Sequence, residues 1–452
     1  MIKLWAKCLL AACSLLAIVV AANATVAAAT EAAPDDPPTA VLTLESVLAE
    51  ALESSAELEA VRAQVRAAEA SIAPVGALPD PMLSLSVSDM PVGGVRLDET
   101  PMSGVELGLS QLVPGGSKRS LRRQVRELEV VALLARYQDR RNDLVRRARR
   151  AYYDLQYLDA AVVIAGQDRQ LAQDLLATAE ARYATGGGLQ QDVFRAQVRL
   201  SRMIDTLVAL RQRRAAAAVR LNRLLYRPPS QPVPALPPLT RTYFSLADQA
   251  LGIRAVESNP QLAEARTLVE QMQTQARLAA EGIRPDYTLG FMYRFRQEVP
   301  MEPMPGEDFW SVSAAINLPW IYRSQTVDQE VAGAQAQQMA AASNLEALLN
   351  EIAAGIDELL VEIVRDDEQL ALLETGLLPQ AEGALASSMA AYATGQVDFL
   401  TLIDNQMNLY QLQMQGLELI ADHERNLADL EYLVGEPLAP ESRAMEVSSS
   451  AN

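Results

Sequence analysis

The sequence contains one unit twice, and this duplication constrains the fold more than any other feature. The segment Ala181–Gly186 (ARYATG) recurs 209 residues later as Ala390–Gly395 (AAYATG), and other landmarks follow in the same order in both halves. A proline-rich linker at 228–240 separates a first repeat, 40–227, from a second, 241–437. We therefore expect two copies of one structural unit within a single chain.

Each repeat is predicted to run helix, two strands, very long helix, turn, helix. Long stretches rich in Ala, Glu, Arg and Leu predict the helices, which we expect at 42–76, 117–184, 190–226, 245–282, 324–394 and 398–434. Thr43 is the expected N-cap of the first helix, and Pro379 should kink the fifth. At ~1.5 Å per residue, the helix over 117–184 would be about 100 Å long. A rod of that length favours a coiled coil over a compact globule.

Apolar residues in the last helix of each repeat step by three and four, the pattern of a coiled-coil seam. These residues are Val193, Ala196, Leu200, Met203, Leu207 and Leu210 in the first repeat, and Leu400, Ile403, Met407, Tyr410, Met414, Leu417 and Ala421 in the second. The core of an ordinary helical bundle would give a similar stripe.

Four segments alternate apolar and polar residues with a period of two, at about 82–89, 104–112, 287–297 and 309–318. Each has about ten residues, the length of a tilted transmembrane strand. Eight of the 22 aromatic residues fall within 287–322, and Trp310 and Trp320 are predicted to form part of a membrane girdle. A small sheet half-buried on a soluble core would alternate in the same way.

Four strands cannot close a barrel, because an open edge in lipid leaves backbone groups unpaired. Closure therefore needs further chains, although the spacing does not give their number. The fold class predicted from the residues is mainly α with a small transmembrane β part.

The first 29 residues read as a secretory signal peptide: a basic start, an apolar stretch and small residues at the cleavage sites. A transmembrane anchor is an alternative, and Leu10–Cys13 (LAAC) matches a lipoprotein cleavage box, so lipidation of Cys13 stays open. No later apolar run is long enough for a membrane helix. Residues 438–452 read as a disordered tail.

The composition argues against most enzymes and against nucleic-acid binding. The net charge is −18, whereas nucleic-acid binding depends on neutralising phosphates. His423 is the only histidine, and both cysteines lie in the first thirteen residues, so thiol catalysis and most zinc sites are not expected in the body. Arginines between Arg119 and Arg150 read as a solvated helix face. We expect no catalysis, no cofactor and no resident metal.

At this point the sequence resembles the bacterial outer-membrane efflux (TolC-like) family. The resemblance is carried by the duplicated Tyr-x-x-Gly turns, Tyr183–Gly186 and Tyr392–Gly395, and by Asp192–Gln197 and Thr401–Gln406, which follow them. Further matches are Gly76–Pro81 before a strand and Leu377–Gln380. The resemblance covers roughly 40–437, nearly the whole mature chain.

The resemblance implies a homotrimer in the outer membrane of a Gram-negative-type cell. Four strands per protomer would contribute to a 12-stranded β-barrel, continued into the periplasm by a long α-helical coiled-coil barrel. It also implies two partners, a periplasmic adaptor (membrane fusion) protein and an inner-membrane efflux pump, and contact with outer-membrane lipid. The protein would be a passive exit duct; the alternative is a periplasmic coiled-coil adaptor or scaffold protein.

In such proteins the Tyr-x-x-Gly turns form the periplasmic tips, where adaptors dock and the tunnel constricts. Carried over by position, the docking residues are Tyr183, Gly186, Tyr392 and Gly395, and the gate ring is Asp192 and Asp404. Family members can carry a further acid where Thr401 stands here, so the ring is expected to be weaker or shared between the repeats. A solvated helix face would explain the two aspartates equally well.

The Pro-Asp-Pro segment at 79–81 and the Pro-Gly-Gly-Ser-Lys-Arg segment at 114–119 resemble the heavy-metal branch of the family. Methionines crowd the two expected outer loops (Met90, Met102, Met301 and Met304). Thioether sulfur suits soft Cu(I), although methionine also fills gaps without any ligand. The exported substrate is not evident from the residues.

Overall fold

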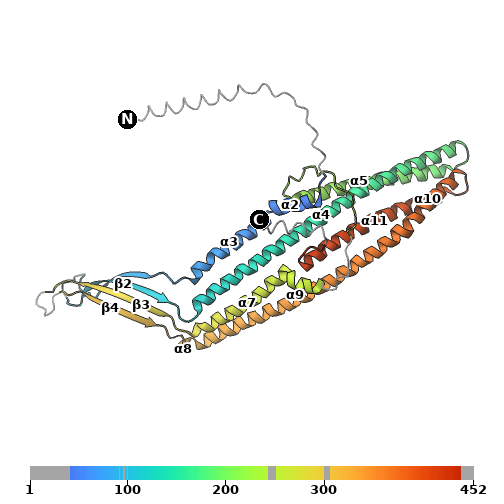
Figure 1. Ribbon diagram of the computed structural model, residues 1–452. Helices are drawn as coiled ribbons and strands as arrows, with labels where there is room; N and C mark the ends of the chain where they lie inside the picture. Colours follow the sequence, from blue (N-terminus) through green and yellow to red (C-terminus); the bar gives the residue numbers. More distant parts are fainter. Residues whose placement is uncertain are drawn as a thin grey trace, which may run out of the picture.

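The computed structural model describes residues 41–90, 92–94, 97–98, 100–242, 251–299 and 306–438. The molecule is long and narrow, with a small sheet at one end and, at the other, the turns that connect consecutive long helices (Figure 1). We call this second end the tip. The predicted signal peptide, Cys13, and all but the first residue of the predicted tail lie outside the described residues.

In its described residues the first repeat contains the helices α2 (Leu44–Ser54), α3 (Ala56–Gly76), α4 (Lys118–Ala184) and α5 (Gln190–Leu224). The hydroxyl of Thr43 caps α2 by accepting from the Ser46 backbone N–H, as expected. The single helix expected over 42–76 is divided, because Ser55 has extended backbone and its hydroxyl accepts from the backbone N–H of Leu58. Ser55 thereby ends α2 and begins α3.

The second repeat contains α6 (Leu251–Ser258), α7 (Pro260–Ala280), α9 (Ser324–Leu372), α10 (Leu378–Ala393) and α11 (Phe399–Val434). Asn259 divides the helix expected over 245–282, since its side-chain oxygen accepts from the Gln261 and Leu262 backbone and Pro260 begins α7. A π-helical turn at Leu373–Leu377 interrupts the long helix beside Pro379, where the sequence predicts a kink.

The sheet has the order β1-β2-β3-β4, with antiparallel neighbours. Its strands are β1 (Met82–Ser88), β2 (Gly104–Val113), β3 (Tyr287–Arg296) and β4 (Phe309–Ile316), each ending within two residues of the expected span. The β2–β3 pairing joins the two repeats, while β1 and β4 are edges. Leu85, Leu107, Tyr293 and Trp310 form one cross-strand row, and large apolar side chains of all four strands are exposed.

From the sheet to the tip, the helices run side by side along the length of the molecule (Figure 1). The long helix α4 packs against α3 and α5, which follow one another along it, and also against α7 and α11. The helices α9 and α10 pack beyond α7 and α11. The outer side of α3 and α5 and the outer side of α9 and α10 are therefore the two lateral edges of the protomer. None of the described helices is both long and apolar enough to cross a bilayer.

Hydrogen bonds and an ion pair connect the two repeats where the sheet meets the helices. Lys118, at the start of α4, places its ammonium 2.8 Å from a carboxylate oxygen of Asp286 and 2.7 Å from the Arg284 carbonyl. The backbone N–H of Gly115 donates to the same Asp286 oxygen. A Cβ at Gly115 would lie 1.8 Å from the carbonyl oxygen of Pro285, so only glycine fits this crossing.

Candidate functional site at the helical tip

The two turns that carry the duplicated motif have the same backbone geometry. The φ angles of Gly186 and Gly395 are 72° and 79°, a region that residues with a Cβ rarely adopt. In each turn the glycine N–H donates to the carbonyl of the motif tyrosine, and the next N–H donates to a carbonyl five residues back. These hydrogen bonds satisfy the last carbonyls of α4 and α10 and reverse the chain.

The two motif tyrosines occupy different environments. Tyr183 is 49% exposed, whereas Tyr392 is 3% exposed. The ring of Tyr392 lies 5.3 Å from that of Phe399 in a cluster that includes Leu175 of α4 and Leu385 of α10. Burial, and then the charge of Asp192, raise the pKa of Tyr392 above its ordinary value. Tyr183 therefore faces solvent, whereas Tyr392 packs between the hairpin formed by α4 and α5 and the hairpin formed by α10 and α11.

Arg182 connects the two turns directly, and the sequence analysis did not identify it. Its guanidinium donates to the backbone carbonyl of Tyr392 in the second turn and, at 2.8 Å, to that of Gly187 in its own turn. It also lies 4.6 Å from the centroid of the Tyr392 ring. The second repeat has Ala391 at the equivalent position. This difference between the copies was the signal that could have identified the contact.

The two predicted gate carboxylates lie on different helices near the tip. Asp192, half-buried in the first turn of α5, acts on Tyr392 through its charge. Asp404 is exposed on α11 and lines a groove between α5 and α11, which it shares with Phe194, Arg195 and Leu400. The groove is a largely apolar surface that contains one carboxylate and several arginines.

A buried polar cluster joins three helices above the tip. Asp168 of α4 accepts from Arg199 of α5 at 2.8 Å and from the Gln406 amide of α11 at 2.9 Å. All three residues are buried. Burial raises the pKa of Asp168, and Arg199 and Gln406 oppose that rise. The cluster ties the second hairpin to the first, because removing one partner would leave another buried without its bond.

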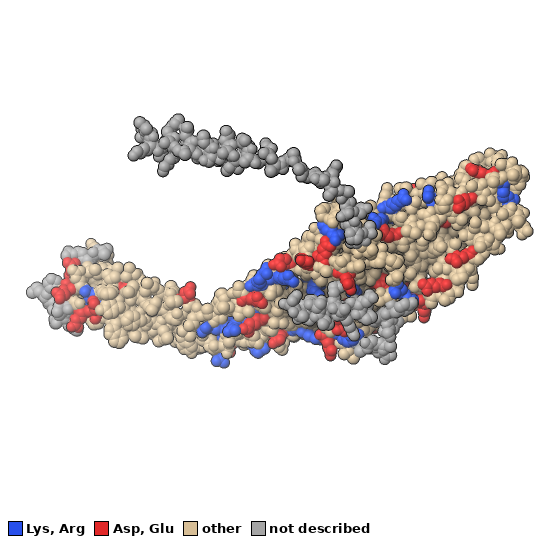
Figure 2. Space-filling model, turned by 45° about the horizontal axis from the view of Figure 1, so that its top comes forward, with Lys and Arg blue, Asp and Glu red and all other residues tan. Residues whose placement is uncertain are grey.

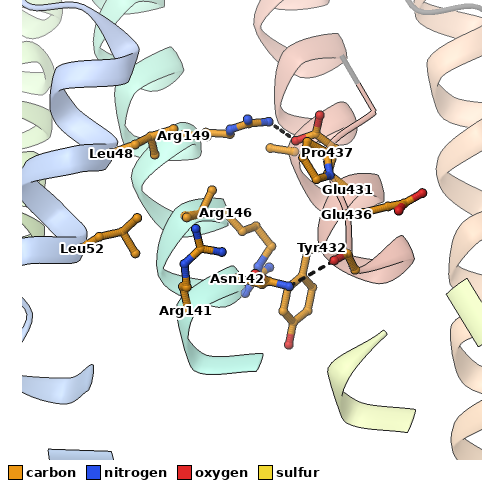
Figure 3. A pocket seen from close by; sticks show the side chains of 13 residues that line it. Leu48, Leu52, Arg141, Asn142, Arg146, Arg149, Glu431, Tyr432, Glu436 and Pro437 are labelled. Atoms are coloured by element: carbon orange, nitrogen blue, oxygen red, sulfur yellow. Dashed lines mark hydrogen bonds and ion pairs between the residues drawn. The ribbon is translucent and has the colours of Figure 1, made fainter. Parts of the chain in front are cut away.

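Further from the tip, the repeats also meet at a pocket lined by α2, α4 and the end of α11 (Figure 3). Arg149 of α4 pairs with Glu431 of α11, and the Asn142 amide lies 3.4 Å from the Gly435 carbonyl. The guanidinium of Arg146 lies 4.8 Å from the ring centroid of Tyr432. These contacts connect the repeats across the pocket.

The predicted girdle residues lie at opposite ends of β4. Trp310 is the second residue of the strand and is 68% exposed, while Trp320 lies in the short helix α8 (Pro319–Tyr322) and is 47% exposed. Of the loop methionines, Met102 is exposed, and Met301 and Met304 lie outside the described residues. Within the described part of the chain no group of three His, Cys, Asp or Glu side chains could hold a metal.

The chain matches a known protein family. A family model described as outer membrane efflux protein matches residues 47–225 and 251–436. None of the curated protein sequences matches this chain.

Several solved structures share the fold at low sequence identity. The outer-membrane channel OprN has a TM-score of 0.74 at 18% identity, over 90% of this chain and 92% of OprN. The outer membrane protein VceC of Vibrio cholerae has a TM-score of 0.73 at 18% identity, over 87% and 96%. The open state of the MtrE outer membrane channel of Neisseria gonorrhoeae has a TM-score of 0.73 at 17% identity, over 88% and 89%.

Proposed function

Because this chain belongs to the outer membrane efflux protein family, it is a channel component of an efflux system in the outer membrane, and we propose that three copies form a passive exit duct. The family assignment rules out the alternative of a periplasmic adaptor. The observation that carries the proposal is a four-stranded sheet with two unpaired edges and apolar side chains exposed along every strand.

The edges of the sheet suit closure with further copies of the chain. Neighbouring strands alternate in direction, so β4 of one copy beside β1 of the next continues the antiparallel order. Three copies supply twelve strands and leave no edge in lipid. Trp310, near the start of β4, and Trp320, in α8 roughly 25–30 Å further along the chain, would lie at the two faces of the hydrocarbon layer.

The helical tip is the proposed periplasmic aperture. Exposed Tyr183, with Gly186 and Gly395 in the turns, would form the docking surface for a periplasmic adaptor, and buried Tyr392 would support it from beneath. The partner adaptor and an inner-membrane pump would open the tip and supply the energy. The heavy-metal branch remains a prediction, and the class of cargo is open.

Asp192 and Asp404 are proposed to form the gate ring. Repeated around a symmetric pore, carboxylates near the aperture would attract cations and repel anions. Exposed Asp404 is the better candidate, since Asp192 is half-buried beside Tyr392.

Oligomer size and conductance test these proposals. Protein extracted from the outer membrane should run as a trimer on native gels and form channels in planar bilayers; a monomer there would refute the duct. Asp404→Ala should weaken cation preference, whereas Glu69→Ala, which removes an exposed acid on α3, should not. Unchanged selectivity in Asp404→Ala would remove that residue from the ring without affecting the trimer.

A further inference from the structure

The two lateral edges of the protomer carry opposite charge. Helix α5 has eight arginines and two aspartates. The opposite edge, 324–393, has twelve Asp and Glu residues and a single base, Arg365. In Figure 2 blue and red side chains both lie along the margin formed by α5, whereas red ones predominate toward the tip along the margin formed by α9 and α10.

Many of these charges are exposed and have no ion-pair partner among the residues that the structure describes. Along α5, among the described residues, the exposed arginines without a salt bridge are Arg202, Arg211, Arg213, Arg220 and Arg223. Along α9 and α10 the exposed acids of this kind are Asp328, Glu346, Glu351, Asp357, Glu358, Glu368, Glu374 and Glu382. By contrast, several arginines of α4 pair with acids of its own chain, such as Arg147 with Glu57.

Both edges also expose apolar side chains on the side away from their own partners. On α5, Leu210, Ala217 and Leu221 are buried, whereas Val208 and Val219 are 48% and 45% exposed. Val208 lies two residues from Leu210, and Val219 lies two residues from both Ala217 and Leu221. A step of two residues turns about 200° around the helix, so both valines face away from α4. On the other edge, Val361 and Leu372 are 70% and 60% exposed.

We propose that the outer edge of α5, with arginines on both flanks of its exposed valines, binds the acidic outer edge of α9 and α10 of the next copy, so that ion pairs around an apolar strip form the seam between protomers. This inference rests on the trimer of the proposed function and specifies which surfaces close it. A seam joining two copies of α5 would bring arginine against arginine, so the charges favour a head-to-tail ring over a two-fold dimer.

Height along the molecule identifies which residues meet. The symmetry axis of the proposed trimer runs along the helices, and rotation about it does not change a residue's distance from the tip. Side chains on facing edges of two adjacent copies can therefore meet only if they lie at similar distances from the tip. Arg211 and Arg213 lie 21 and 23 residues after the start of α5, and Glu374 and Glu368 lie 19 and 25 residues before the end of α10. At ~1.5 Å per residue, all four lie about 30–40 Å from the tip.

Cysteine cross-linking tests the seam in full-length protein, because both native cysteines lie within the first thirteen residues. Arg213→Cys combined with Glu368→Cys should give disulfide-linked dimers and trimers on oxidation in the membrane. Arg213→Cys with Glu418→Cys is the matched control: Glu418 is exposed at similar height, but on α11, away from the edge. A trimer in which the control pair links and the test pair does not would overturn the seam.

Charge reversal tests the ion pairs themselves. Arg211→Glu with Arg213→Glu should raise the monomer-to-trimer ratio in detergent at least about fivefold at 0.1 M salt, and less at 1 M, where the screening length falls from about 10 to about 3 Å. Adding Glu368→Arg and Glu374→Arg should restore the parent ratio. A reversed protein that stays trimeric, or one that the second pair does not rescue, refutes the ionic seam. A parent protein that is itself monomeric in the membrane refutes the proposed duct.

Discussion

Replacing Arg182 by alanine should loosen the tip of each protomer. Among the described residues, this is the only side chain with a hydrogen bond from one turn to the other: it donates to the Tyr392 carbonyl and stacks on the Tyr392 ring, 4.6 Å from its centroid. Its bond to Gly187 stays within one turn and does not hold the hairpins together. Arg182→Ala removes both inter-hairpin contacts and leaves the backbone of the turns unchanged.

The size of the effect follows from those two contacts. A hydrogen bond from a charged donor contributes about 1.5–3 kcal/mol, and a partly exposed cation–π contact about 0.5–1 kcal/mol. Their sum, about 2–4 kcal/mol, corresponds to a shift of roughly 30-fold or more between closed and open tips, at 1.4 kcal/mol for each factor of ten. Solvent near the half-buried guanidinium reduces this, so we expect a shift of at least about tenfold.

Single-channel recording in planar bilayers measures this shift as open probability. Arg182→Lys should have an intermediate effect, because an ammonium keeps the charge but lacks the planar two-pronged geometry. Arg66→Ala, which removes an exposed ion pair with Glu59 on α3, is the control and should leave gating unchanged. The reasoning fails if Arg182→Ala, assembled as the parent is, opens no more often than the parent.

Three further substitutions test packing, backbone and titration. Asp168→Ala should lower the thermal unfolding midpoint, because it leaves Arg199 buried and unpaired at a cost of about 3–5 kcal/mol, and Asp168→Leu with Arg199→Met should recover most of the loss. Gly395→Ala should destabilise by about 1–2 kcal/mol, given the φ angle of 79°, whereas Gly166→Ala inside α4 should be neutral or stabilising, as a Cβ there meets nothing within 4 Å. Burial acts to raise the pKa of Glu424, but hydrogen bonds from His423 and Thr242 hold it below its ordinary value of 4.5; the stability it contributes is present above pH 4.5 and is lost as the pH falls below that value, so Glu424→Gln should flatten acid unfolding curves in that range.

The regular elements could be predicted because their sequence periods are long and uninterrupted. Helix α4 has no proline and one glycine across 67 residues, so nothing local competes with the helix. The strands alternate apolar and polar residues over most of their length and end where the helix-favouring composition resumes. The helix breaks were missed because each depends on one capping residue. Asn259 followed by Pro260 is a helix-start signal that a longer helical pattern concealed.

The site was harder to predict, because a shared motif does not show how its two copies differ in environment. The same Tyr-x-x-Gly turn leaves Tyr183 exposed and buries Tyr392, since only the second packs between two hairpins. The informative position is the one that differs, Arg182 against Ala391. The same reasoning applies to the edges, where one repeat carries arginines and the other carries acids. In a duplicated fold the shared residues build the unit twice, so the contacts that hold unlike surfaces together must come from residues at which the copies diverge.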